Sequence, residues 1–271
     1  YSLDGLRKLN NAFEKVYFIL GNHDLFYRET RDVNSVEFVK ELPNIILIDS
    51  VLSEGDCTFV SWLVGDEWKK IPKIKSKYMF GHFELPTFKL NAMVEMPDHG
   101  GLKSEMFTNQ EFVFSGHFHH RQIKGNVIYT GNAFPHNFSD AGDDERGWMF
   151  LDWGKDPEFF AWPDAPKYKN ITLSDLLVDP SKYLLPKTTA RITLDIDISY
   201  EEANFIKDTF IEAYDLRDIS LQPMKNTQHE EDTGAELHFE TIDEIVISQL
   251  NSIDDGGSFN KKILVELYQN L

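Results

Sequence analysis

The sequence predicts an α/β layered fold for residues 1–165, on three observations. Short runs rich in aromatic and β-branched residues, typical of buried strands, alternate with helical or irregular stretches. Three of these runs stop at a glycine followed by polar side chains, as strands do at the ligand-binding edge of an open α/β sheet. Hydrophobic residues make up 41% of the chain, which is enough for a packed core. Together these features indicate a sheet layered with helices.

Eight runs are expected to be strands. They cover 16–20, 45–49, 57–63, 77–80, 111–115, 127–130, 147–153 and 157–162. The segment before the first strand is expected to be a helix, because its apolar residues recur at helical spacing. These residues are Leu3, Leu6, Leu9, Ala12 and Phe13. Residues 137–146 are expected to form a turn-rich loop, and the Pro-containing stretch 162–166 closes the domain.

A second, smaller unit of α+β type is expected over residues 166–227, beginning with a linker. From Arg191 to Ile198, apolar and polar residues alternate as they do in a half-buried strand. Ser199 is placed to cap a following helix, from Tyr200 to Tyr214, with Glu202 as its capping-box partner.

Residues 228–271 are expected to form an acidic linker and a helical tail. Two segments of this tail carry apolar residues at helical spacing. One holds Ile242, Ile245, Val246 and Leu250, and the other holds Phe259, Ile263, Leu267 and Leu271. Such stripes either pack on the chain's own core or dock on a partner.

The composition excludes several classes of protein. The single cysteine, Cys57, rules out an internal disulfide, and its apolar surroundings favour a small strand residue over a nucleophile. No apolar stretch approaches the ~18 residues of a membrane-spanning helix, and the first residues do not resemble a signal peptide. We therefore expect no membrane association and a cytoplasmic location.

The net charge of −18 is unevenly distributed along the chain. Between Asp195 and Leu271 there are 18 acidic and 5 basic residues, so most of the negative charge lies in the last third. This argues against DNA lying along that third, because phosphate contacts need Lys and Arg. It does not exclude DNA at a metal site, where cations neutralise the phosphate.

The polar residues that follow three of the strands indicate metal chemistry. Their strings are Gly-Asn-His-Asp at 21–24, Gly-His at 81–82 and Gly-His-Phe-His at 116–119. Neutral imidazole and amide oxygen are good ligands for divalent metals, and the neighbouring glycines let the backbone come close. A single histidine of this kind is more often an ordinary hydrogen-bonded residue. Three such strings in this order predict a metal site.

The set of motifs resembles the calcineurin-like metallophosphoesterase family, whose members hold two metal ions. Gly-His-Phe-Glu at 81–84, Ser-Gly-His-Phe-His at 115–119 and Arg-Gly-Trp-Met-Phe-Leu-Asp at 146–152 resemble one branch in particular. That branch contains the nuclease subunit of SbcCD-type DNA repair complexes and its tailed-phage recombination endonuclease counterpart. The resemblance implies an α/β sandwich nuclease domain over 1–165, a capping domain within 166–227 and a partner-binding tail over 228–271.

The resemblance also assigns roles to the polar residues. It implies that Asn22, His82 and His117 bind one metal ion and His119 the other, with Mn²⁺ as the expected metal. It implies that His23 is not a ligand but faces the phosphate and the leaving group. The catalytic residues expected are His23 and Asp24, the latter holding the second imidazole nitrogen of His23. The sequence assigns no role to His120, Arg121 or His136.

The sequence departs from the family pattern in one respect. The family's Asp-x-His and Gly-Asp-x-x-Asp motifs precede the Asn-His pair, and nothing before Gly21 matches them. We therefore expect an amino-terminal stretch with these motifs to be missing. Without a bridging carboxylate, we expect at most one weakly held ion on this chain, and we expect the chain alone to be inactive.

The function implied by the resemblance is metal-dependent hydrolysis of DNA phosphodiester bonds in a repair or recombination complex. The partner implied is an SMC-like coiled-coil ATPase, and a homodimer is one possible assembly. Two alternatives stay open. A stand-alone calcineurin-like phosphatase or small-molecule phosphodiesterase shares the metal motifs, and a non-catalytic binding subunit fits a chain without the acidic motifs.

Overall fold

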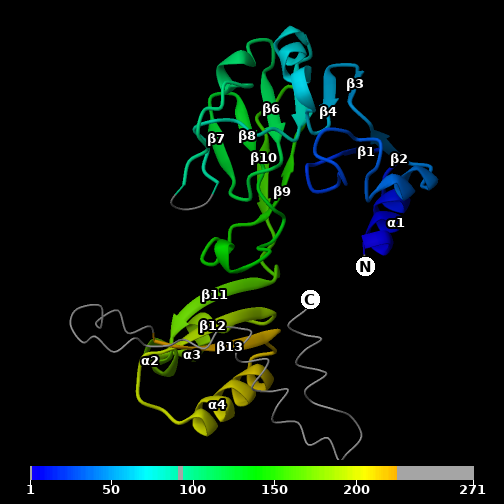
Figure 1. Cartoon of the computed structure of the whole chain (residues 1–271). Coiled ribbons are helices and arrows are strands. Elements are labelled where there is room, and N and C mark those ends of the chain that lie inside the picture. Colours follow the sequence, from blue (N-terminus) through cyan, green and yellow to red (C-terminus); the bar gives the residue numbers. More distant parts are fainter. Residues whose placement is uncertain (1, 91–93, 225–271) are drawn as a thin grey trace, which may run out of the picture. The chain divides into compact units, whose positions relative to one another are not determined.

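A computed structural model describes residues 2–90 and 94–224, and Figure 1 shows how the elements follow one another. The two amphipathic segments predicted at 242–250 and 259–271 lie outside the described residues. The strands are β1 (Val16–Ile19), β2 (Ile45–Ile48), β3 (Val51–Glu54), β4 (Cys57–Val60), β5 (Tyr78–Gly81), β6 (Phe112–Ser115), β7 (Gln122–Lys124), β8 (Val127–Tyr129), β9 (Gly147–Phe150), β10 (Glu158–Ala161), β11 (Lys167–Thr172), β12 (Thr188–Leu194) and β13 (Asp218–Pro223).

Four α-helices and four 3-10 helices connect these strands in the described part of the chain. The α-helices are α1 (Ser2–Ala12), α2 (Leu173–Val178), α3 (Pro180–Tyr183) and α4 (Tyr200–Ala213). The 3-10 helices are η1 (Glu37–Glu41), η2 (Gly65–Lys73), η3 (Ser104–Met106) and η4 (Phe138–Asp140). The mixed α/β class predicted from the sequence is confirmed.

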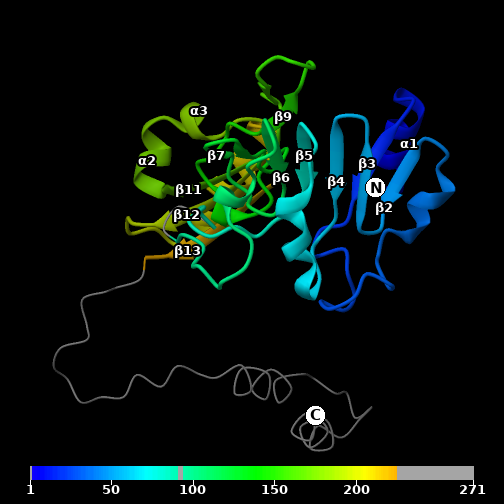
Figure 2. The same cartoon turned by 90° about the horizontal axis from the view of Figure 1, so that it is seen from above.

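A six-stranded sheet with the order β3-β4-β5-β6-β8-β7 carries the main core. Its four inner strands run parallel, and the edge strands β3 and β7 pair antiparallel with their neighbours. Figure 2 shows β4, β5 and β6 side by side. Apolar residues from these strands and from the segments after them form one buried cluster that includes Val60, Met79, Phe83, Val113 and Tyr129. This sheet positions the candidate site.

Each of the eight runs expected to be strands contains one. The strands β3 and β7 were not predicted, because each is short and only partly apolar. Both are joined to a neighbouring strand by a tight turn with glycine at positive φ, Gly55 at 57° and Gly125 at 59°. Only the completed hairpin shows that these residues are paired.

Residues 166–224, which belong to the predicted second unit, contain a parallel sheet with the order β11-β12-β13. The helix predicted at 200–214 is confirmed as α4, and both halves of the capping box between Ser199 and Glu202 are present. The predicted strand is also present, but β12 covers Thr188–Leu194 and ends before Asp195. Residues 167–183, expected to belong to a linker, instead form β11, α2 and α3. Pairing with β12 gives β11 a strand structure that its mixed sequence did not reveal.

In the described part of the chain, no helix has the length and apolar character needed to span a membrane.

Candidate metal centre

The parallel sheet brings His82 and His117 to the same edge. Gly81 and Ser115 are paired residues of β5 and β6, so the next residues of both strands leave the sheet together. The Gly116 amide donates to the Gly81 carbonyl oxygen at 2.9 Å, which continues the pairing one step beyond the strands. His82 and His117 follow directly, and their ring centroids are 5.3 Å apart.

Asn22 reaches this edge through a separate connection. It follows β1, which pairs in parallel with β2 in a two-stranded sheet. The Leu20 amide donates to the Ser61 hydroxyl at 2.8 Å, and the Trp62 amide donates to the Leu20 carbonyl at 2.7 Å. These two bonds fasten the end of β1 beside the end of β4. Asn22 therefore arrives at the edge that carries His82.

The distance between the side chains of Asn22 and His82 suits two ligands of one ion. Asn22 Oδ1 lies 3.0 Å from His82 Nε2. Two donor atoms that each lie ~2.1 Å from one cation at a right angle are separated by about 3 Å. With His117 beside them, the residues present fit one divalent ion held by neutral donors.

Two glycines make room for the imidazole of His82. A Cβ added at Gly21 would lie 2.9 Å from His82 Cε1, and one added at Gly116 would lie 2.9 Å from His82 Nδ1. A side chain at either position would push the ring away. The glycines in the two sequence strings thus allow the backbone to approach the ring closely, as predicted from the sequence.

Burial keeps both histidines in their neutral, ligand-competent form. It lowers the pKa of His82 to about 4, with the nearby charges of His117 and His23 acting in the same direction. Burial also lowers the pKa of His117, and the Glu84 carboxylate partly opposes this shift. Metal binding requires deprotonated imidazole, so these environments favour a cation at neutral pH.

His117 has a backbone conformation that few residues other than glycine adopt. Its φ is 88°, which lies in the left-handed region. Its Nε2 lies 3.1 Å from Glu84 Oε2, and its ring lies 5.3 Å from the ring of Trp62. Such strain persists where surrounding contacts maintain it, and it concentrates at functional sites.

His119 belongs to a second group of polar residues. Its Nδ1 lies 3.5 Å from Asp140 Oδ1, and its ring centroid lies 5.6 Å from that of His136. Although burial alone would raise the pKa of Asp140, the His136 amide and the charges of Arg146 and His119 hold it below its ordinary value. Asp140 is therefore a carboxylate that orients the His119 ring.

The buried side chain of Arg146 joins the members of this second group. Its side chain is 1% exposed, and its Nη2 lies 3.3 Å from Asp140 and 2.9 Å from Asp143. Its Nη1 donates to the carbonyl oxygen of His119. Asp143 in turn contacts His120 Nδ1 at 2.5 Å. One buried guanidinium thus fixes two carboxylates, each of which contacts one of two consecutive histidines.

His23 and Asp24 are exposed and half-buried, respectively, next to Asn22. The charge of His23 lowers the pKa values of both His82 and His117, which places it close to the predicted ligands. The Asp24 carboxylate accepts a hydrogen bond from the Gly21 amide at 2.7 Å. The structure thus gives Asp24 a different partner from the expected His23 imidazole, and its contact shapes the turn that presents Asn22.

The residues described contain no group of three or more His, Cys, Asp or Glu arranged to hold a metal ion. The predicted set of Asn22, His82 and His117 contains only two residues of these types, because its third donor is an amide. A site with only neutral donors attracts a cation less strongly than one with carboxylates. The expectation of at most one weakly held ion stays a prediction.

Sequence reasoning missed Glu84 and Trp62 as neighbours of this site. Glu84 has a local signal, since it lies two residues after His82 in an extended segment and so shares its face. Trp62 has none, because it follows a different strand. The burial of Arg146 also lacked a signal, although the residue opens one of the strings that carry the family resemblance.

No family model matches the chain. The chain is similar to exonuclease subunit 1 of Enterobacteria phage T4, with 23% identity over 279 aligned residues. The similarity covers 98% of this chain and 78% of the relative. It therefore includes both the segments that supply the candidate metal ligands and the second unit.

The low pKa of His82 predicts a loss of stability in weak acid. The unfolded chain binds a proton at His82 below about pH 6.5, whereas the folded chain binds it only near pH 4. The free energy of unfolding should therefore fall as the pH falls between these values, by about 3 kcal/mol if this histidine acts alone. Denaturant titrations from pH 7 to pH 4.5 measure the slope.

The matched variants for this titration are His82→Gln and His99→Gln, since His99 is an exposed histidine of a loop. His82→Gln should flatten the dependence of stability on pH, and His99→Gln should leave it unchanged. Equal slopes in the wild-type chain and His82→Gln would show that the buried imidazole does not set the acid sensitivity.

Proposed function

We propose that this chain is the nuclease subunit of a DNA repair or recombination complex, and that the complex hydrolyses DNA phosphodiester bonds with divalent metal. The observation that supports this most is the convergence of Asn22, His82 and His117 at one sheet edge. It occurs in a chain that is similar over nearly its whole length to a phage exonuclease subunit. The proposal rests on the metal motifs and the similarity together.

The predicted ligands for one Mn²⁺ ion are Asn22, His82 and His117, and His119 is the proposed ligand of a second ion in the complete family site. When bound there, a divalent ion would supply Lewis-acid activation of a phosphoryl oxygen and of a water molecule. The chain's own contribution is to hold the donors in place. The two glycine backbones fix the His82 ring, and Asp140 orients that of His119.

His23 is the proposed general acid for the departing 3′ oxygen. It is exposed, it follows the predicted ligand Asn22, and its charge acts on both His82 and His117. A protonated imidazole at this position can donate a proton to the leaving alkoxide. Asp24 supports it indirectly, because its contact with the Gly21 amide closes the turn that carries both Asn22 and His23.

An SMC-like coiled-coil ATPase is the proposed partner. The phage relative is named as a subunit, which fits a chain that works in an assembly. The proposed docking segments belong to residues 228–271. Co-purification of the chain with such an ATPase, and its loss on deletion of residues 235–271, is the corresponding test.

The direct test of the proposed function is Mn²⁺-dependent cleavage of DNA by protein expressed from its complete gene. We expect hydrolysis of linear DNA that EDTA abolishes and that His23→Ala reduces about 10²–10⁴-fold. Purification of His23→Ala in parallel, with its melting temperature measured, controls for folding.

A small-molecule phosphodiesterase is the alternative outcome of the same assay. Mn²⁺-dependent turnover of bis(p-nitrophenyl) phosphate without any cleavage of DNA, with or without an ATPase, would favour it. Binding of DNA without hydrolysis of either substrate would favour a non-catalytic subunit.

A further inference from the structure

A small pocket opens beside the candidate metal centre. It has a volume of about 200 Å³, and its lining includes Trp62, Trp68, Leu102, His82 and Glu84. Pockets for drug-sized ligands start at about 300 Å³, so this one has room for a single small ring system. Because His82 is both a predicted metal ligand and part of the lining, whatever occupies the pocket lies next to the reacting centre.

The pocket combines aromatic and apolar side chains with the polar groups of His82 and Glu84. The ring of Trp62 lies 5.9 Å from that of His82 and 5.3 Å from that of His117, so it adjoins both predicted ligands. Trp68 is half-buried and packs on the main core, together with the neighbouring Leu63. Two half-exposed indoles can stack on a flat, weakly polar ring. A metal ion at the adjoining candidate centre would attract an anionic group attached to that ring.

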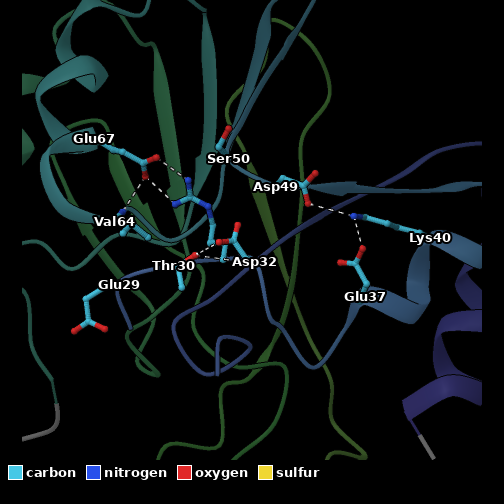
Figure 3. A pocket seen from close by; sticks show the side chains of 10 residues that line it. Glu29, Thr30, Asp32, Glu37, Lys40, Asp49, Ser50, Val64 and Glu67 are labelled. Atoms are coloured by element: carbon cyan, nitrogen blue, oxygen red, sulfur yellow. Dashed lines mark hydrogen bonds and ion pairs between the residues drawn. The ribbon is translucent and has the colours of Figure 1, made fainter. Parts of the chain in front are cut away.

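The wall that carries Trp62 is fixed by hydrogen bonds. The Trp62 carbonyl oxygen accepts a hydrogen bond from Arg31 Nη1 at 2.8 Å, and Arg31 donates two further hydrogen bonds of 2.6 and 2.7 Å to the carboxylate of Glu67. Glu67 also accepts from the Val64 amide at 2.9 Å, as Figure 3 shows. This bidentate pair is mostly shielded from solvent, with the Arg31 side chain 15% exposed. The wall that carries Trp62 is therefore preorganised for a ligand.

The larger cavity in Figure 3 is a poorer candidate for a ligand site. Its volume is about 570 Å³, and five of its ten lining residues are acidic. The cations Arg31 and Lys40 already contact Glu67, Glu37 and Asp49. These ion pairs match the cavity's cations with its own carboxylates, and the Arg31–Glu67 pair fixes the segment after β4.

We propose that the pocket lined by Trp62 and Trp68, here called the tryptophan pocket, holds one unstacked nucleobase. This base belongs to the DNA strand whose phosphodiester lies at the candidate metal centre. The inference rests on the proposed function and adds a substrate class to it. A base inside a duplex must leave its stack to enter such a pocket, and this costs least at single-stranded or frayed positions. The substrate is then DNA with an unpaired nucleotide at the cleavage point.

Glu84 gives the pocket a preference among bases. Its carboxylate lies in the lining and is exposed at the rim, where Oε2 also contacts His117. A carboxylate can only accept hydrogen bonds at neutral pH, so it favours bases that present an exocyclic amine. Cytosine and adenine carry such an amine at their pairing edge, whereas thymine has only one ring N–H there, between two carbonyl oxygens that a carboxylate repels.

The test measures binding of dCMP, dAMP, dTMP and 2-deoxyribose 5-phosphate to the chain in the presence of Mn²⁺. Titration calorimetry and quenching of tryptophan fluorescence are the readouts. We expect dCMP and dAMP to bind more tightly than dTMP, and all three more tightly than the base-free sugar phosphate. Trp62→Ala should weaken dCMP binding roughly 5- to 100-fold, as loss of base stacking does, and Trp62→Phe should retain most of it.

Two further variants separate the pocket from general effects. Trp148→Phe is the control, because Trp148 is 56% exposed and stacks on Phe160 in the β9–β10 hairpin. It should leave dCMP binding unchanged. Glu84→Gln should reduce the preference for dCMP over dTMP. A general disturbance near His117 would instead weaken the binding of both nucleotides and leave their affinity ratio unchanged.

The proposal is overturned if 2-deoxyribose 5-phosphate binds as tightly as dCMP, or if Trp62→Ala binds dCMP like the wild-type chain. The proposal is supported if Trp62→Ala loses base-dependent binding while Trp62→Phe and Trp148→Phe retain it. Base-dependent binding without any cleavage of DNA by the complete gene product would refute the proposed nuclease function but leave the pocket assignment standing.

Discussion

Replacing His82 by alanine is expected to abolish Mn²⁺ binding to the chain. The imidazole is held neutral by burial, sits between the backbones of Gly21 and Gly116, and presents Nε2 at 3.0 Å from the Asn22 amide oxygen. Loss of a residue that only supports a ligand costs 10- to 100-fold in metal affinity, so loss of a ligand should cost more than about 100-fold. Isothermal titration with Mn²⁺ measures the effect.

Two histidine variants serve as comparisons in the same titration. His99→Ala, in an exposed loop, should bind Mn²⁺ like the wild-type chain. His23→Ala should also keep most of the affinity, because the proposed role of His23 is proton transfer and not coordination. If His82→Ala and His23→Ala lose the metal equally, the roles assigned to the two residues are wrong.

Replacing Arg146 by methionine is expected to destabilise the protein more than any surface substitution. Arg146 is buried, and it bonds to Asp140, which is 3% exposed, to Asp143 and to the backbone of His119. Methionine fills a similar volume but leaves a buried carboxylate without its cation. Breaking a buried ion pair by removing one partner typically costs 3–5 kcal/mol, or about 10 °C in melting temperature for a chain of this size.

Arg121→Met is the matched control for this substitution. Arg121 lies in the same part of the sequence, but it bonds to the exposed Glu145 at 3.3 Å and covers the ring of Phe159. Exposed pairs of this kind are worth about 1 kcal/mol or less. Calorimetric melting curves of the two variants should therefore differ clearly. Equal losses in both would mean that the buried network does not stabilise the loop that carries His119.

The strands and the predicted ligands could be inferred from the sequence because their signals are local. An apolar run that stops at glycine marks a strand end, and parallel strands place such ends at one edge. This reasoning predicts that the polar residues after the three strands lie near one another, although β1 belongs to a separate two-stranded sheet. The grouping of Asn22, His82 and His117 on one ion, apart from His119, is what the family resemblance implies. Ser61 and Trp62 supply the missing connection, and their bonds to Leu20 have no local pattern.

Features created by long-range packing could not be inferred in this way. Arg146 has the sequence signal of an ordinary charged residue, and only the folded loop shows that acceptors from three residues surround it. The same holds for β11, whose mixed sequence becomes a strand when β12 pairs with it. The tryptophan pocket depends on two indoles and a histidine from different elements. Its chemistry appears only when those elements are assembled.

The measurement that tests the account most directly is pulsed electron paramagnetic resonance of Mn²⁺ bound to the chain, with the histidines labelled by ¹⁵N. The account predicts hyperfine coupling to imidazole nitrogen, contributed by His82 and His117. This coupling should weaken in His117→Ala, disappear in the double variant with His82→Ala, and persist in His99→Ala. A bound Mn²⁺ ion without nitrogen coupling, or coupling that survives in the double variant, would contradict the proposed metal centre.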